Sequence, residues 1–181
     1  MGKVTDNLQP KDVFRYFGEL CSIPHGSGNV KKISDYCVEF AKEHGLKYRQ
    51  DESYNVIIWK EASAGYEDKP TVILQGHLDM VAVKDADCTK DMENDGLDLE
   101  VDGDYLYAKK TSLGGDDGIA IAYSLALLAS DKYEHPALEA IFTVDEEIGM
   151  LGAAALDLSD IKGRIMMNID SEEAGIFLAG C

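Results

Sequence analysis

Three short apolar runs in this chain each end in side chains that bind metals or protons, and this pattern constrains the fold most. Residues 71–76 lead into a His-Leu-Asp sequence, residues 139–144 into Asp-Glu-Glu, and residues 164–169 into an aspartate. Continuous apolar runs of this length are typical of strands buried on both faces of a parallel sheet. Ligands of open α/β sheets bind at the carboxyl ends of such strands. We therefore expect one histidine and several carboxylates to gather at one edge of a single sheet.

The order of the expected elements, with helices alternating with buried strands, places the chain in the α/β class. Amphipathic periodicity predicts helices over residues 10–23 and 29–44, and an almost wholly apolar stretch predicts a buried helix over 118–130. A short helix is expected over 148–156. The expected strands are residues 46–50, 54–59, 71–76, 97–101, 105–108, 139–144 and 164–169. A chain of 181 residues has the length of one domain.

Composition excludes several classes of function. The net charge of −17 argues against nucleic-acid binding, which needs a positive surface. No apolar stretch approaches the length of about 20 residues that a membrane-spanning helix needs, and the N-terminus lacks the apolar segment of a secretory signal. The cysteines show neither C-x-x-C nor zinc-finger spacing, and they are Cys21, Cys37, Cys88 and Cys181. These features favour a cytoplasmic protein with reduced thiols.

His77 and Asp79 follow the first of the three apolar runs. A neutral imidazole is a good zinc ligand, and such a histidine is usually oriented by a carboxylate. Side chains two residues apart on an extended segment point the same way, so Asp79 is placed to support His77. A strand-end histidine beside a solvated aspartate is the alternative, and this motif alone does not decide between the two.

A Gly-Gly-Asp-Asp-Gly sequence at residues 114–118 places Asp116 and Asp117 directly before the apolar helix. Adjacent glycines let the backbone come close to a ligand. A carboxylate that bridges two metals about 3.5–4 Å apart needs such a tightly held position. Because acids at a helix N-terminus are also favoured by the helix dipole, this motif taken alone favours a structural role.

Asp145, Glu146 and Glu147 end the second apolar run, and Asp170 ends the third. Three adjacent acids repel one another and need either water or a cation. One glutamate could ligate a metal while its neighbour acts as a general base. A helix N-terminal acid cluster is the alternative, as is a strand cap for Asp170. The occurrence of all these motifs on successive strands favours a metal site, and histidine with carboxylates suits Zn, Mn or Co better than Ca or Mg.

A second acidic motif, at residues 91–96, resembles the start of an EF-hand loop. It lacks flanking amphipathic helices, and it ends in Asp102 where the loop requires a glutamate. We do not expect it to bind calcium.

Taken together, the motifs resemble those of the M20 metallopeptidases, which act with two zinc ions. The sequences at residues 23–29, 75–81, 111–118 and 168–173 are most similar to the bacterial aminoacyl-histidine dipeptidases. The resemblance implies a three-layer catalytic domain with a largely parallel or mixed central sheet flanked by helices. It also implies hydrolysis of Xaa-His dipeptides. Another M20 activity, on tripeptides or acyl groups, and an inactive metal-binding piece stay open as alternatives.

The resemblance also implies a role for each site residue. The implied metal ligands are His77, Asp116 as the bridge between two zinc ions, Glu147 and Asp170. The implied catalytic residues are Asp79, which orients His77, and Glu146, the general base. Mn or Co could replace Zn. The peptide bond between Asp116 and Asp117 is expected to be cis.

Members of this family are much longer than 181 residues. They add a lid domain, which helps to bind substrate and usually forms a homodimer, and then return to the catalytic domain with a last histidine ligand. The resemblance therefore implies that residues 1–181 are the N-terminal part of the catalytic domain, with the lid domain and the C-terminal return absent. We expect an incomplete second metal site and weak or no activity in the isolated chain.

Overall fold

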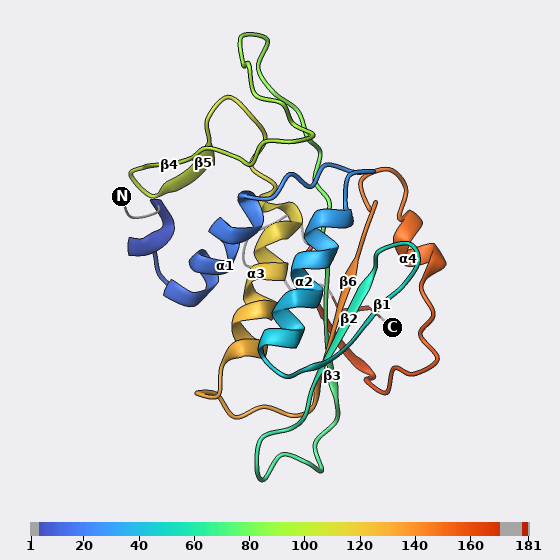
Figure 1. Ribbon diagram of the computed structural model, residues 1–181. Helices are drawn as coiled ribbons and strands as arrows, with labels where there is room; N and C mark the ends of the chain where they lie inside the picture. Colours follow the sequence, from blue (N-terminus) through green and yellow to red (C-terminus); the bar gives the residue numbers. More distant parts are fainter. Residues whose placement is uncertain (1–3, 171–178, 181) are drawn as a thin grey trace.

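A mixed sheet of five strands lies at the centre of the molecule, in the order β1-β2-β6-β3-β7 (Figure 1). The computed structural model describes residues 4–170 and 179–180, so Cys181 lies outside the described part. The strands of this sheet are β1 (Lys47–Gln50), β2 (Val56–Lys60), β3 (Val72–His77), β6 (Leu138–Thr143) and β7 (Ile165–Asn168). The predicted α/β class and the mixed central sheet are confirmed.

Helices cover one face of this sheet (Figure 1). They are α1 (Lys11–Cys21), α2 (Lys31–Glu43) and α3 (Gly115–Ala129). Their apolar stripes meet the strands in the main core, where Phe17, Ile33, Leu125 and Phe142 are almost completely buried. Burial of this apolar surface is the main force that holds the layers together.

The opposite face of the sheet has a thinner cover. Ile57, Ile73 and Ile141 form a small cluster there, against Leu156 and Ile161 of the segment that follows α4 (Leu151–Ala155). The remaining elements are a hairpin of β4 (Leu99–Asp102) and β5 (Tyr105–Ala108) and a short 3-10 helix, η1 (Val4–Asn7). None of the described helices is long and apolar enough to cross a membrane.

Glycines set the ends of two helices. Gly45 follows α2 with a φ of +64°, a left-handed conformation that glycine adopts without strain. Gly114 precedes α3 with a φ of +68°. Asp116 and Asp117 lie in the first turn of α3 but have non-helical backbone angles, so the regular helix begins near residue 118, as the sequence predicts.

Strand direction decides where the site can form. β3 pairs in parallel with β6 on one side and with β7 on the other. His77 lies opposite Thr143 of β6, and Gln75 lies opposite Asn168 of β7. The carboxyl ends of these three strands therefore meet at one edge of the sheet, and the residues that follow each strand become neighbours.

One prediction about burial is wrong. The apolar run at residues 164–169 predicts a strand buried on both faces, but Ile165, Met166 and Met167 of β7 are 50%, 59% and 53% exposed. The physical reason is position, because β7 is the last strand of the described sheet and pairs only with β3. An apolar run indicates that both faces of a strand are suited to burial. It does not indicate that other described residues pack on those faces.

Removal of core volume should destabilise this domain. Leu125 is fully buried at the centre of α3, so Leu125→Ala leaves a cavity and should lower the free energy of unfolding by about 2–5 kcal/mol. Leu158→Ala is the matched control, since Leu158 is 53% exposed and its truncation should change this free energy by less than about 0.5 kcal/mol. Urea denaturation measures both. Equal effects of the two substitutions would contradict the packing described here.

Candidate metal centre

His77 is the last residue of β3, and its side chain is buried among carboxylates. Its Nδ1 lies 2.9 Å from the main-chain carbonyl oxygen of Asp79, which can only accept, so Nδ1 carries a proton and donates it. Its Nε2 lies 3.1 Å from Asp116 Oδ1 and 3.9 Å from Glu146 Oε2. A hydrogen bond at one ring nitrogen fixes the ring and leaves the other nitrogen to face a ligand.

Two groups of possible metal ligands meet at this imidazole. His77, Asp116 and Asp170 each offer one ligand atom, and these atoms lie within 4.8 Å of one another. A second group, within the same limit, consists of His77, Glu146 and Glu147. The structure therefore brings together every residue that the sequence predicts as a metal ligand, from the ends of β3, β6 and β7 and from the first turn of α3.

The donor chemistry of these groups fits a divalent cation. Each group combines one imidazole nitrogen with carboxylate oxygens, a set that suits zinc and similar metals. Among the described residues, the recorded ion pairs of Asp116 and Glu146 involve no lysine or arginine, and His77 is their only cationic partner. The negative charge of the cluster is thus left for another cation to balance.

Asp79 is buried, and its carboxylate contacts His77, Ser27 and the backbone of Glu146 and Glu147. Its Oδ1 lies 3.4 Å from His77 Nδ1 and accepts a hydrogen bond of 3.0 Å from the backbone N–H of Glu146. Its Oδ2 accepts hydrogen bonds from the Ser27 hydroxyl at 2.8 Å and from the backbone N–H of Glu147 at 3.4 Å. One carboxylate therefore connects the end of β3 with the turn that carries both glutamates.

The charges of this pair follow from these contacts. Burial lowers the pKa of His77, but hydrogen bonds and charge from Asp79, Asp117 and Asp116 outweigh it and raise the pKa to about 9. Burial raises the pKa of Asp79, but hydrogen bonds from His77, the Glu146 amide and Ser27 outweigh it and lower the pKa to about 2. Metal binding at Nε2 would therefore displace a proton from the imidazole.

Asp117 belongs to neither candidate ligand group, and its carboxylate contacts the backbone of β3 instead. Its Oδ2 accepts a hydrogen bond of 3.2 Å from the backbone N–H of His77. The peptide bond between Asp116 and Asp117 is cis, as the resemblance implies. Burial and the nearby charges of Asp170 and Asp116 raise the pKa of Asp117 to about 7, against the opposing effect of His77. Asp117 thus supports the backbone of β3 while Asp116 faces the imidazole.

Asn55 is a residue that sequence reasoning missed. It is buried, and its Oδ1 accepts a hydrogen bond of 3.1 Å from the N–H of Val144, at the end of β6. Its Nδ2 donates to Asp51 Oδ2 at 2.7 Å and to the carbonyl oxygen of Gly152 at 2.9 Å. Asn55 therefore fixes the start of the acidic turn to α4. No local pattern predicts the contacts with Val144 and Gly152, because these two partners are distant from Asn55 in the chain.

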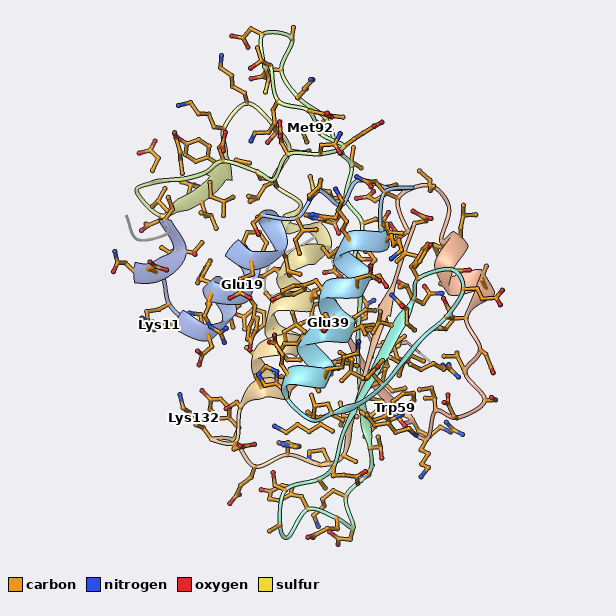
Figure 2. The ribbon with its side chains drawn as sticks, in the orientation of Figure 1. Lys11, Glu19, Glu39, Trp59, Met92 and Lys132 are labelled. Carbon is orange, nitrogen blue, oxygen red and sulfur yellow. The ribbon has the colours of Figure 1, made fainter. Side chains whose placement is uncertain are left out.

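The EF-hand-like sequence at residues 91–96 forms a turn in which the Asp91 carboxylate accepts hydrogen bonds from residues of the same turn. Asp91 Oδ1 accepts a hydrogen bond from the N–H of Glu93 at 3.0 Å, and Asp91 Oδ2 accepts one from Asn94 Nδ2 at 2.8 Å. Figure 2 shows Met92 of this turn above the central helices. Within the described residues, this turn contributes no ligand atom to either candidate metal group.

Comparison with known proteins identifies two bacterial dipeptidases that are similar to this chain. The chain is 40% identical over 174 residues to the cytosol non-specific dipeptidase of Escherichia coli (strain K12), an alignment that covers 96% of this chain and 36% of that protein. Its structure matches the aminoacylhistidine dipeptidase of Vibrio alginolyticus with a TM-score of 0.91 and 41% identity, over 94% of this chain and 35% of that one. The chain is therefore homologous to these two bacterial dipeptidases over almost its whole length.

More distant matches show the fold alone. A tripeptidase from Staphylococcus aureus matches with a TM-score of 0.74 at 23% identity, over 90% of this chain and 43% of that one. No protein-family model matches the chain. The chain spans about a third of the length of the two bacterial dipeptidases, at 36% and 35%.

The contact between Asp117 and β3 requires a glycine at residue 76. A Cβ atom there would lie 2.7 Å from Asp117 Oδ2 and 3.1 Å from the side chains of Ala120 and Ile121. Gly76→Ala should therefore lower the free energy of unfolding by about 1–3 kcal/mol, measured by urea denaturation. In Gly115→Ala, the matched control, the nearest atom is 3.8 Å away, and no stability should be lost. An unchanged Gly76→Ala variant would contradict this close approach.

Proposed function

We propose that this chain carries the two-metal site of a dipeptidase that hydrolyses the amide bond of dipeptides, with Xaa-His dipeptides as the preferred class. The observation that carries this proposal is the pair of ligand groups that share His77 at the carboxyl edge of the sheet. The names of the two bacterial relatives, a non-specific dipeptidase and an aminoacylhistidine dipeptidase, support the reaction and the substrate class.

The proposed ligands would hold two zinc ions, and Mn or Co could occupy the same positions. His77 and Asp170 serve the first ion, Glu147 serves the second, and Asp116 serves both. The contact of the Asp116 carboxylate with His77 supports its place at the first ion, and its charge reaches Glu147, where burial and then Asp116 raise the pKa. Bound zinc polarises a carbonyl oxygen and lowers the pKa of water, which is the chemistry that amide hydrolysis needs.

Glu146 is the proposed general base. Its carboxylate lies 3.9 Å from His77 Nε2 and is partly exposed. Its backbone N–H donates a hydrogen bond of 3.0 Å to Asp79 Oδ1, which fixes the position of its main chain. Glu146 would take a proton from the attacking water as a carbon–oxygen bond forms at the scissile carbonyl. It would then give that proton to the leaving amine as the carbon–nitrogen bond breaks.

We further propose that residues 1–181 form the N-terminal part of the catalytic domain of a cytoplasmic, homodimeric enzyme. The cytosolic name of the Escherichia coli relative and the share of that protein covered, 36%, support this arrangement. A lid domain would complete the dimer, and a histidine from the returning segment would complete the second metal site. The substrate is then a small peptide, and neither nucleic acid nor membrane is a partner.

Metal content tests this proposal directly. The purified chain, prepared without chelator and analysed for elements, should contain one or two zinc-like ions, and His77→Ala should lose at least the first ion, because this imidazole is one of its proposed ligands. His135→Ala is the matched control, since His135 Nδ1 contacts only the carbonyl oxygen of Pro136 and lies in neither group. Equal metal content in the two variants would argue against the site.

The role of Glu146 can be separated from that of a ligand. Glu146→Gln should leave zinc affinity unchanged and lower dipeptide hydrolysis by about 10²–10⁴-fold, because the base is lost and the ligands stay. Glu147→Gln should weaken zinc binding. Activity is measured in a chimera in which residues 1–181 replace the matching part of the Escherichia coli dipeptidase. A Glu146→Gln chimera with full activity would contradict the assignment.

The isolated chain should be weakly active or inactive, because the proposed returning segment would supply one ligand of the second metal position. Release of histidine from Gly-His, measured by chromatography with zinc present, should be far slower than in the chimera. Gly-Leu and a tripeptide in the same assay would show whether the substrate class is correct. Rapid turnover by the isolated chain would contradict the proposed division of the site.

A further inference from the structure

A short segment before α2, residues 25–29, lies against the turns that follow β3 and β6 and near the turn that precedes α3. Met80 donates its N–H to the carbonyl oxygen of His25 at 3.1 Å, and Ser27 donates its N–H to the carbonyl oxygen of Met80 at 3.2 Å. Gly26 and Met80 form a parallel bridge. The segment therefore runs beside the chain directly after β3, where Asp79 lies.

The same segment is hydrogen-bonded to the turns after β3 and β6. The Ser27 hydroxyl donates to Asp79 Oδ2 at 2.8 Å. The next residue, Gly28, donates its backbone N–H to Asp145 Oδ1 at 2.7 Å. These two contacts join the ends of neighbouring parallel strands from outside the sheet, at the level of the proposed ligands.

Close packing leaves the segment little freedom. A Cβ atom on Gly26 would come within 2.7 Å of the Ala82 side chain. A Cβ atom on Gly114, in the turn that leads to Asp116, would lie 3.2 Å from His25 Nε2. The segment thus lies close to the turn before α3 as well. Its tightly packed backbone holds Ser27 in the position from which the hydroxyl contacts Asp79.

Ser27 acts on the acidic turn through Asp79. The carboxylate of Asp79 is buried, and it accepts hydrogen bonds from the N–H groups of both Glu146 and Glu147. The Ser27 hydroxyl is its only hydroxyl donor among the described residues. Rotation of the Asp79 carboxylate would break its hydrogen bonds to both amides. The Ser27 hydroxyl, which fixes this carboxylate, therefore also fixes the backbone of the two glutamates.

We propose that Ser27 is a positioning residue for the metal site, which sets the Asp79 carboxylate and, through it, the backbone of Glu146 and Glu147. Ser27 contacts neither the metal ligands nor the proposed base, so its effect is indirect. The inference rests on the proposed function, because the groups that it positions are the ones assigned to metal binding and proton transfer. Residues of this kind that support ligands typically change metal affinity by about 10–100-fold when removed.

The test compares Ser27→Ala with Ser27→Thr, which restores the hydroxyl, and with Ser112→Ala. Ser112 is the matched control because its hydroxyl bonds only to main-chain groups, those of Val81 and Val83. Zinc affinity is measured by competition with a chromophoric chelator. Ser27→Ala should weaken binding by roughly tenfold, whereas Ser27→Thr and Ser112→Ala should bind zinc as the unaltered chain does.

Amide hydrogen exchange in the metal-free protein gives a second, independent readout. In Ser27→Ala, exchange at Glu146 and Glu147 should be faster while core amides such as that of Ile58 stay protected. Unchanged zinc affinity with unchanged exchange at the two glutamates would overturn the inference, as would faster exchange throughout the core. If the unaltered chain binds no zinc, the proposed function fails, but the exchange measurement still decides whether Ser27 positions the acidic turn.

Discussion

Hydrogen bonding between β3 and its two parallel neighbours places three strand ends at one edge of the sheet, and the site depends on this alignment. The register sets His77 beside Thr143, so the acidic turn after β6 begins next to the imidazole. A slip of one residue would turn each side chain to the opposite face of the sheet. Burial of β6 on both faces makes such a slip costly, because its apolar side chains fill the core.

Charge is the second constraint on this edge. Asp79 and Asp117 are buried, and the hydrogen bonds recorded for their carboxylates come mainly from backbone N–H groups and from Ser27. Buried carboxylates stabilised in this way hold the turns in place without a lysine or arginine partner in the described part of the chain. The carboxylates that face His77 have no recorded lysine or arginine partner among the described residues, and their oxygens suit a divalent cation.

The sequence predicts most elements because each has a strong local signal. The apolar periodicity predicts α1, α2 and the buried strands to within two or three residues, and the clustered acids predict the location of the site. The exposure of β7 does not follow from its own apolar pattern, since such a pattern does not specify which neighbours cover a strand. The contacts of Asn55 with Val144 and of Ser27 with Asp79 were also beyond prediction, because these partners lie 89 and 52 residues away and only the fold brings them together.

The proposed zinc site lies where the ends of β3, β6 and β7 meet. Anomalous diffraction at the zinc edge, from crystals of the chain grown with zinc, locates the bound metal. A strong anomalous peak should lie beside His77 Nε2, between the carboxylates of Asp116 and Asp170. A peak confined to another place, such as the acidic turn at residues 91–95, or no peak at His77 in zinc-saturated crystals, would contradict the proposed site.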